Sequence, residues 1–417
     1  MNGPRRNIRD MPFGRRHSGF SALERLQELN TWRMVLFCLM VSMALAPSMA
    51  SVVLYFTGMA AMGTVISARR MIWNLIDPVD PTNRDRRIDS FTDTDCWRHL
   101  RFRKRDLPEL LRLVDLPAYI NCGTDERPLM VSGEYAFLLF LYRIHYPSTL
   151  ALLQQPFGRE YSQLSRIYTA TVKWLDARHR HKVVGNIYWY RQRFDQYNAS
   201  INTALARSPA NPFPGTVPVY LNNLFGFIDG TARYICRPWR NNNAQFPMYN
   251  GYFHAHCMIF LGVSFPDGMV VLEPPFPGYF TDVMAWRDCH VRHQLDILAE
   301  DRADNNLPNL KLYGDKIFTT CALITAAFSL RFGPLTPWMT TMNRMMSPIR
   351  VSIEWCYGKI IARHKHADYR QKIQESAVAK QYYLAALFAN AHTCLYGCQS
   401  TTFFSMAPPT VQQYFSQ

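Results

Sequence analysis

Hydrophobic residues in the first half of the chain recur at helical spacing. Segments 106–115, 133–146 and 162–175 each place apolar side chains three or four positions apart, which predicts helices. Pro147 ends the second helix, because proline cannot continue one. With the turn at 156–158 before the third helix, the pattern is compatible with a helix-turn-helix.

Beyond residue 219 the pattern changes to the length and spacing of strands. An apolar run at 222–230 continues with strand character to residue 236, and a second run occupies 256–265. The sequence Pro-Asp-Gly at 266–268 is a strong tight-turn signal that returns the chain to a third strand at 269–272. These segments predict a three-stranded antiparallel meander.

A helix and a further strand follow the meander. Thr281 is a suitable N-cap for a helix from about 282 to 300, and residues 310–313 form a short apolar run before Gly-Asp. Three antiparallel strands, a helix, a strand and then helices is the order of a ribonuclease H-like α/β fold. We therefore predict a ribonuclease H-like domain with a mixed sheet, preceded by an all-α helical region.

Residues 34–68 depart from this pattern, because they contain no charged residue and no histidine. The segment exceeds the roughly 20 apolar residues that a bilayer requires. Pro47, Gly58 and Gly63 interrupt it, which argues against one continuous helix. Two interpretations stay open: a membrane span that anchors the protein, and a hydrophobic segment that packs internally.

Breaks in composition indicate how the chain is divided. Two Asp-Pro pairs at 77–81, followed by a highly charged connector, predict a boundary near 75–90. The predicted units are a basic flexible tail (1–33), the hydrophobic segment (34–76), a helical DNA-binding-like region (77–206), a proline-rich linker (207–218), the catalytic domain (219–400) and a C-terminal tail (401–417).

The charge balance suggests a polyanionic partner. The chain has 46 Lys and Arg against 31 Asp and Glu, a formal net charge of +15, which favours nucleic acid or an acidic membrane surface. Arg166 and Lys173 lie on the third predicted helix, where they suit either DNA contact or a solvated helix face. The ten cysteines lack the spacing of a disulfide framework, so we interpret them as reduced thiols.

Two aspartates follow apolar runs of strand length. Asp229 ends the run at 222–229, and Asp315 follows the run at 310–314. Burying an ionised carboxylate costs several kcal/mol unless a partner compensates it, so these positions call for an explanation. If the two strands are neighbours, the carboxylates meet at one edge of the sheet, and Glu354 on a predicted helix could reach the same edge.

Carboxylates in this arrangement suit a two-metal centre for phosphoryl transfer. Two divalent ions about 3.5–4 Å apart would activate the attacking oxygen and stabilise the leaving one, and hard oxygen ligands suit Mg²⁺ or Mn²⁺. Each acid also has a simpler explanation. Asp229 and Asp315 lie beside glycines, as in turns. Glu354 can pair with Arg350 one turn earlier, and Asp282 suits the first turn of a helix.

Short motifs form a series through the second half of the chain. They are Ile-Asp-Gly-Thr (228–231), Tyr-Asn-Gly (249–251), His-Cys-Met (256–258), Pro-Asp-Gly (266–268), Pro-Gly-Tyr-Phe-Thr-Asp (277–282), Gly-Asp-Lys-Ile-Phe (314–318) and Arg-Val-Ser-Ile-Glu-Trp-Cys-Tyr-Gly-Lys (350–359). In this series the chain resembles the PIF/Harbinger transposases and the HARBI-like DDE superfamily endonucleases. Upstream, segments 102–116, 157–159 and 164–167 resemble the helical DNA-binding region of that family.

The resemblance implies a DDE triad of Asp229, Asp315 and Glu354 that holds Mg²⁺ or Mn²⁺. Asp282 would be an auxiliary acid and metal ligand. It also implies cutting of DNA, joining of the 3′-hydroxyl to a target, a nuclear location and usually a separate Myb/SANT-like protein for DNA binding. One departure is Thr281, which stands where the family usually has His.

Our hypothesis is a divalent-metal-dependent DNA endonuclease or transposase-like protein. Its DNA-facing surface would include Arg350, Lys359 and Arg363, which follow one another near Glu354. Two alternatives stay open: a domesticated, catalytically inactive DNA-binding protein, and a membrane-anchored interaction protein that depends on residues 34–68. The sequence leaves the DNA target open and is compatible with a homo-oligomer.

Overall fold

The structure, a computed structural model, describes residues 84–124, 126–238, 242–371 and 377–417. Asp80–Gln417 forms one compact unit. The predicted basic tail and the hydrophobic segment therefore lie outside the described residues. Within the described ranges, no helix has both the length and the apolar character needed to cross a membrane.

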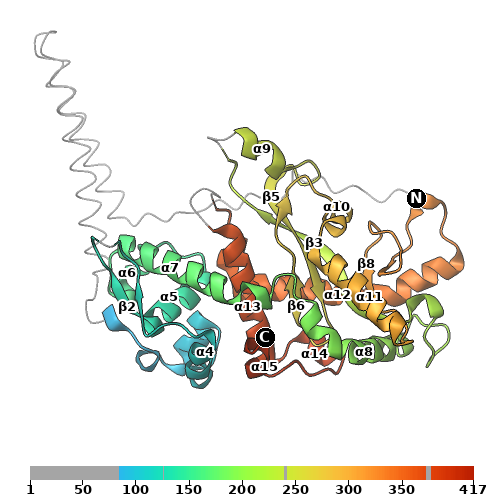
Figure 1. The fold of residues 1–417 in the computed structure, drawn as a ribbon, viewed down its shortest axis with the longest axis horizontal. Coiled ribbons are helices and arrows are strands. Elements are labelled where there is room, and N and C mark those ends of the chain that lie inside the picture. The colour runs from blue at the N-terminus through green and yellow to red at the C-terminus, as the bar shows by residue number, and fades with distance from the viewer. Residues whose placement is uncertain (1–83, 125, 239–241, 372–376) are drawn as a thin grey trace, which may run out of the picture. The chain divides into compact units, whose positions relative to one another are not determined.

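A mixed sheet lies at the centre of the described chain (Figure 1). Its main path runs in the order β4-β5-β3-β8-β9, and β6 and β7 pair with β5. The strands are β3 (Leu224–Tyr234), β4 (Tyr249–Asn250), β5 (Ala255–Ser264), β6 (Val270–Leu272), β7 (Phe276–Pro277), β8 (Lys311–Gly314) and β9 (Ile324–Ala326).

The predicted antiparallel meander is confirmed. β3 pairs antiparallel with β5, and β5 pairs antiparallel with β6. Gly268 in the connecting turn has φ of 77°, a conformation that glycine adopts at little cost. The strand character predicted up to residue 236 is present as far as Tyr234, because pairing with β5 extends along the whole second half of β3. Asp229 therefore lies inside the strand, and the expectation that it would end the strand is wrong.

Helices and one hairpin complete the described chain. The hairpin consists of β1 (Tyr119–Asn121) and β2 (Met130–Ser132). The α-helices are α3 (Asp93–Asp95), α4 (Leu107–Val114), α5 (Gly133–His145), α6 (Gln154–Phe157), α7 (Tyr161–His179), α8 (Phe194–Ala206), α9 (Asn242–Met248), α10 (Asp282–Arg287), α11 (His290–Asp304), α12 (Pro337–Arg363), α13 (Val378–Tyr396), α14 (Gln399–Phe403) and α15 (Val411–Phe415).

The helix predicted for 282–300 is two helices. Thr281 caps α10 as expected, since its side chain accepts a hydrogen bond from the Met284 amide. The chain then breaks before α11, where buried Glu273 on the strand side accepts hydrogen bonds from the amides of His290 and Val291. A carboxylate at a helix N-terminus is favourable, so Glu273 fixes a second start that the apolar pattern could not indicate.

One hydrophobic core joins the helices to the sheet. It includes side chains of α5, α7, α8 and α13 together with those of β3, β5 and β8. α8 packs on β3, and α12 packs on the same strand. Residues 207–218 therefore connect parts of one packed body. The division of the chain into a DNA-binding region and a catalytic domain stays a prediction.

Candidate active site

Strand register brings Asp229 and Asp315 to the same place. β3 and β8 are parallel, and Phe227 lies opposite Tyr313. Asp229 and Asp315 each follow two residues later, so they lie level with one another at the point where β8 has ended. Because side chains on a strand alternate between faces, the Asp229 carboxylate lies on the same face of β3 as Phe227. Asp315 follows the end of β8, and its carboxylate is near enough to Asp229 to raise the pKa of that residue. The neighbouring strands inferred from the sequence are thus present.

Asp282 joins these two aspartates from the start of α10. It is the first residue of that helix, and it packs directly against Gly230, the residue after Asp229. A Cβ at position 230 would lie 1.9 Å from Asp282 Oδ1, which is closer than atoms can approach. Only glycine at this position leaves room for the Asp282 carboxylate beside β3.

The three aspartates influence each other's ionisation. Burial, together with the nearby carboxylates of Asp282 and Asp315, raises the pKa of Asp229 to about 7, although Arg350 opposes the rise. Burial and the carboxylate of Asp315 together raise the pKa of Asp282 to about 6. Three acids that repel one another in a half-buried site are poorly compensated by the protein alone.

Two of the three aspartates, Asp229 and Asp315, also contact a backbone donor of their own chain segment. Asp229 Oδ1 accepts a hydrogen bond of 3.0 Å from the Gly230 amide, and Asp315 Oδ1 accepts one of 2.8 Å from the Ile317 amide. Across the described ranges, no three His, Cys, Asp or Glu side chains are arranged as a ready metal cage. The three aspartates are close enough to shift the pKa of Asp229. Because they do not already form a metal cage, their side chains would have to reorient to share an ion.

Arg350 connects Asp229 to Glu354. Its Nη1 lies 3.6 Å from Asp229 Oδ2, and its Nη2 lies 2.8 Å from Glu354 Oε1. The side chain of Glu354 is 53% exposed, whereas that of Asp229 is 19% exposed. Glu354 thus reaches the acids on β3 through the guanidinium of Arg350, and the simpler explanation of Glu354 as an i−4 ion pair is present in the same arrangement.

Tyr357 is a residue of the site that the sequence did not single out. Its hydroxyl donates a 2.6 Å hydrogen bond to the backbone carbonyl of Asp229. A Cβ at Gly262, which lies opposite Asp229 on β5, would come within 2.6 Å of that hydroxyl. The sequence offered one sign of this role: Tyr357 stands three residues after Glu354, in the same motif at 350–359.

The predicted DNA-contacting residues differ in exposure. Arg166 and Lys173 are exposed on α7, and Arg363 is half-buried. Lys359 does not fit the prediction. It is buried, and its ammonium donates to the Gly268 carbonyl and, at 2.9 Å, to the Thr393 hydroxyl, so it is turned into the protein.

The described cysteines are all free thiols, in agreement with their scattered spacing.

The family model for DDE superfamily endonucleases matches residues 228–390. The match begins one residue before Asp229, and its range includes Asp282, Asp315 and Glu354. No curated protein and no solved structure matches the chain.

Proposed function

We propose that this protein is a divalent-metal-dependent DNA endonuclease that acts through Asp229, Asp282 and Asp315. The observation that carries the proposal is the raised pKa of Asp229, to about 7, and of Asp282, to about 6, at neighbouring positions inside the range matched by the endonuclease family. Acids tuned in this way cluster at functional sites. A ribonuclease H-like fold and membership of the PIF/Harbinger group are part of the same proposal.

The donor set fits a hard divalent cation. Carboxylate oxygens are the ligands that Mg²⁺ and Mn²⁺ prefer, and a cation would remove the repulsion that raises the two pKa values. Asp229, Asp282 and Asp315 would hold the ions, with Glu354 as a further ligand. When bound, such ions activate an attacking oxygen and stabilise the charge of a phosphodiester in the transition state.

The protein's own groups provide position and charge balance. Tyr357 fixes the backbone at Asp229 through its hydrogen bond to the carbonyl. Arg350 supplies the positive charge next to Asp229 and Glu354. With a pKa of about 7, Asp229 is partly protonated at neutral pH, and it must lose that proton before it can act as a ligand.

A plasmid-nicking assay tests the proposal. In Mg²⁺ or Mn²⁺ the wild-type chain should convert supercoiled DNA to the nicked form, and Asp229→Asn or Asp315→Asn should lower the rate by about 1,000-fold or more, because metal ions contribute several kcal/mol to such reactions. Asp304→Asn is the matched control, since Asp304 is an exposed acid at the end of α11. Nicking by Asp229→Asn at the wild-type rate would reject the site.

Glu354→Gln decides how many acids are needed. An equal loss of nicking would make Glu354 a member of the triad, as the family resemblance implies. A loss below about tenfold would leave the three aspartates as the metal-binding group, with Glu354 acting only as a partner of Arg350, to which it is bound at 2.8 Å.

A catalytically inactive DNA-binding protein is the second candidate. The bridge that Arg350 forms between Asp229 and Glu354 favours it, because a guanidinium there already compensates two of the acids. Binding of DNA that weakens with salt, without nicking in either metal, would support this candidate.

A Myb/SANT-like partner, a homo-oligomer and a nuclear location are further parts of the first proposal. A membrane anchor rests on residues outside the described ranges.

A further inference from the structure

Five exposed aromatic side chains belong to α9 and to the segments around β4 and before α10. Figure 1 shows α9 and α10 on the same side of the sheet region. We call these five side chains the aromatic tip. The exposed fractions range from 40% for Phe253 to 87% for Tyr252. Its members come from α9, β4, the loop before β5 and the loop before α10, and they are Phe246, Tyr249, Tyr252, Phe253 and Tyr279.

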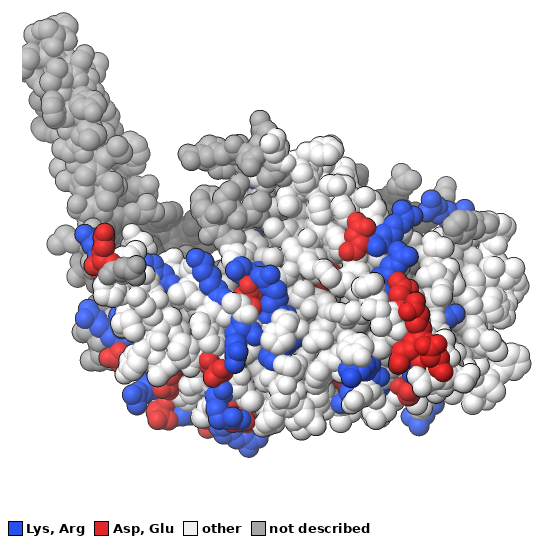
Figure 2. Space-filling view, viewed as in Figure 1, with Lys and Arg blue, Asp and Glu red and all other residues white. Residues whose placement is uncertain are grey.

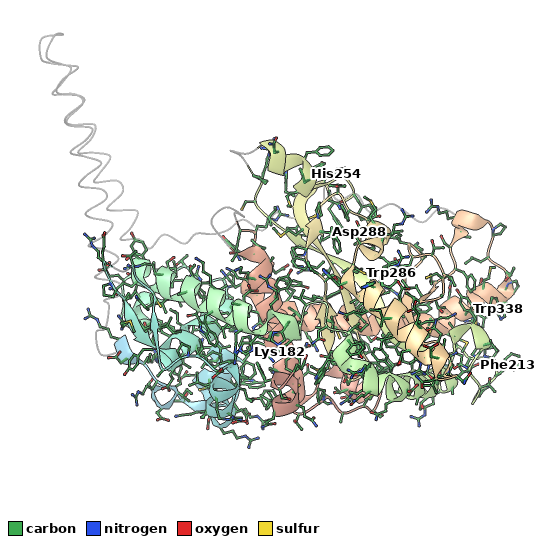
Figure 3. The ribbon with its side chains drawn as sticks, in the orientation of Figure 1. Lys182, Phe213, His254, Trp286, Asp288 and Trp338 are labelled. Carbon is green, nitrogen blue, oxygen red and sulfur yellow. The ribbon has the colours of Figure 1, made fainter. Side chains whose placement is uncertain are left out.

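The rings of the aromatic tip are held in place by the fold. Asn250, which is buried, donates a 2.6 Å hydrogen bond to the Gly278 carbonyl and so joins the β4 turn to the loop before α10. Its side-chain oxygen also accepts from the amides of Tyr252 and Phe253. Figure 3 places His254, the next residue, at the outer end of this region. The exposure of these rings is therefore a consequence of an ordered turn.

Neighbouring rings of the aromatic tip contact one another in two groups. The ring centroids of Tyr252 and Phe253 lie 5.1 Å apart, and Phe253 lies 5.9 Å from Tyr234 at the end of β3. On the other side, Phe246 lies 6.3 Å from Tyr279. The loops that carry the two groups are joined by the hydrogen bond from Asn250 to Gly278. Exposed apolar surface gathered in this way marks a candidate interaction site.

The chemistry of the aromatic tip favours unpaired nucleotides over an aliphatic protein partner. Among the described residues of 231–281, every large hydrophobic side chain that is exposed is aromatic. The whole segment 231–266 contains no Asp or Glu, and it includes Arg233 and Arg237. Figure 2 shows the surface over α9 without Asp or Glu in this view. Exposed rings next to arginines are typical of surfaces that bind single strands by stacking on bases.

Cations lie beside the rings. The guanidinium of Arg370 lies 5.2 Å from the centre of the Tyr234 ring. Arg233, the residue before Tyr234, forms an ion pair with Asp368 at 2.9 Å. Arg237 donates a hydrogen bond to the neutral side chain of Gln245. Arg237 and Arg370 thus bring positive charge to the tip, as a phosphate backbone requires.

The aromatic tip is also close to the aspartates along the chain. Tyr279 precedes Asp282 by three residues, and β3 runs directly from Asp229 to Tyr234. Five steps of a strand cover about 16 Å. Side chains five positions apart on a strand point to opposite faces, so Tyr234 lies at the end of β3 and on the other face from Asp229. A nucleic acid strand held at the aspartates would therefore reach the rings on the side of Tyr279, or by passing the end of β3.

We propose that the aromatic tip stacks the unpaired bases of a DNA strand that flanks the site of cleavage. The inference rests on the proposed function, because it takes the aspartates as the site of cleavage. It assigns the substrate class as DNA with a single-stranded segment next to the scissile bond. Stacking is tolerant of sequence, because every base presents an aromatic face. The tip would thus hold the strand without reading which bases it carries.

The test is a binding measurement with the full chain, in Ca²⁺ so that binding is separated from cutting. Fluorescence anisotropy would compare labelled oligo(dT) of 20 nucleotides with a blunt duplex of 20 base pairs. Phe246→Ala and Tyr252→Ala should each weaken oligo(dT) binding by about tenfold, and duplex binding by less than about twofold. Tyr252→Trp should retain binding. Phe213→Ala is the control, because Phe213 is 69% exposed and far from the tip in Figure 3.

Three outcomes would overturn the inference: no binding of oligo(dT) by the wild type, unchanged binding by both alanine variants, or an equal loss of oligo(dT) and duplex binding. Unchanged binding would assign the aromatic tip to a protein partner instead. Asp229→Asn separates this inference from the proposed function. If that variant still nicks DNA while Tyr252→Ala loses oligo(dT) binding, the catalytic site is wrong and the stacking surface stands.

Discussion

Two regions along α12 deal with buried charge in opposite ways. Near Arg350, α12 faces aspartates whose pKa values are raised, to about 7 for Asp229 and about 6 for Asp282. At its C-terminal end, burial and neighbouring positive groups lower the pKa of histidines, to about 4 for His145 and about 3 for His392. Both regions avoid ionised side chains that the protein cannot solvate.

The basic region reaches neutrality without a ligand. His364 is buried, and neither of its ring nitrogens has a hydrogen-bond partner among the described residues. Burial lowers its pKa well below the usual value, and His145, His392 and Arg363 add to the effect. A neutral imidazole in this position packs as an aromatic ring, so the region is explained by structure alone.

The acidic region reaches neutrality only by taking up a proton or a cation. Asp229, Asp282 and Asp315 lie within interaction range, and Arg350 pairs with Asp229 among them, so the negative charge exceeds the positive charge when all three are ionised. A divalent ion would compensate this excess, whereas nothing comparable would benefit the histidines. The difference between the two regions is the reason to place function at the aspartates.

The largest effect should follow from charging the basic region. His364→Lys places a fixed charge where both ring nitrogens are unpartnered, and we expect it to lower the free energy of unfolding by about 3–5 kcal/mol at pH 7. His364→Phe, which keeps an aromatic ring without the charge, should change it by less than about 1.5 kcal/mol. Urea unfolding followed by circular dichroism measures both. Equal effects of the two variants would mean that packing, not charge, governs this position.

A smaller effect should follow from disturbing the geometry of the acidic region. Gly230→Ala would displace Asp282, since the added Cβ overlaps its carboxylate, and we expect nicking to fall by about 100-fold. Gly358→Ala on α12 is the matched control, because nothing lies within 4 Å of a Cβ there, and it should leave nicking intact. Wild-type nicking by Gly230→Ala would show that Asp282 is dispensable.

The smallest effect is the dependence of stability on pH, which has opposite signs in the two regions. The raised pKa of Asp229 gives stability that is present below about pH 4 and lost as pH rises through 7. The lowered pKa values of His145 and His392 give stability that is present above about pH 6.5 and lost as pH falls toward 4 and 3.

We expect a slope of order 1 kcal/mol per pH unit for each strongly shifted group. Unfolding in EDTA at pH 5, 6, 7 and 8 measures it. Asp229→Asn should flatten the fall toward high pH and leave the low-pH fall unchanged, and addition of Ca²⁺ to the wild type should do the same. A wild-type protein whose stability rises steadily from pH 5 to pH 8 would contradict the raised pKa of Asp229.

The sequence predicted the arrangement of Asp229 and Asp315 because a strand leaves a local signal. Apolar runs mark the strands, and an aspartate next to a glycine at the end of each run indicates where it approaches polar surroundings. Parallel pairing of β3 with β8 then follows from the order of elements. Thr281 was found for the same reason, since a helix cap depends on residues within one turn.

Other features depend on residues that are distant in sequence, which no local pattern records. Glu273 caps α11 from 17 residues away, and the hydroxyl of Tyr357 reaches the Asp229 carbonyl over 128 residues. Lys359 was predicted to face DNA because basic residues are usually exposed. Its ammonium instead contacts groups on the β5–β6 turn and α13, which only the tertiary fold brings near.

The backbone at Asp229 has consequences for rates. Asp229 lies inside β3 and pairs with β5 on one side. On the other side, pairing with β8 ends two residues before it, and the hydroxyl of Tyr357 donates a hydrogen bond to its carbonyl. Reorientation of its carboxylate then involves rotation of a side chain alone, so uptake of an ion here would need no slow rearrangement of the main chain.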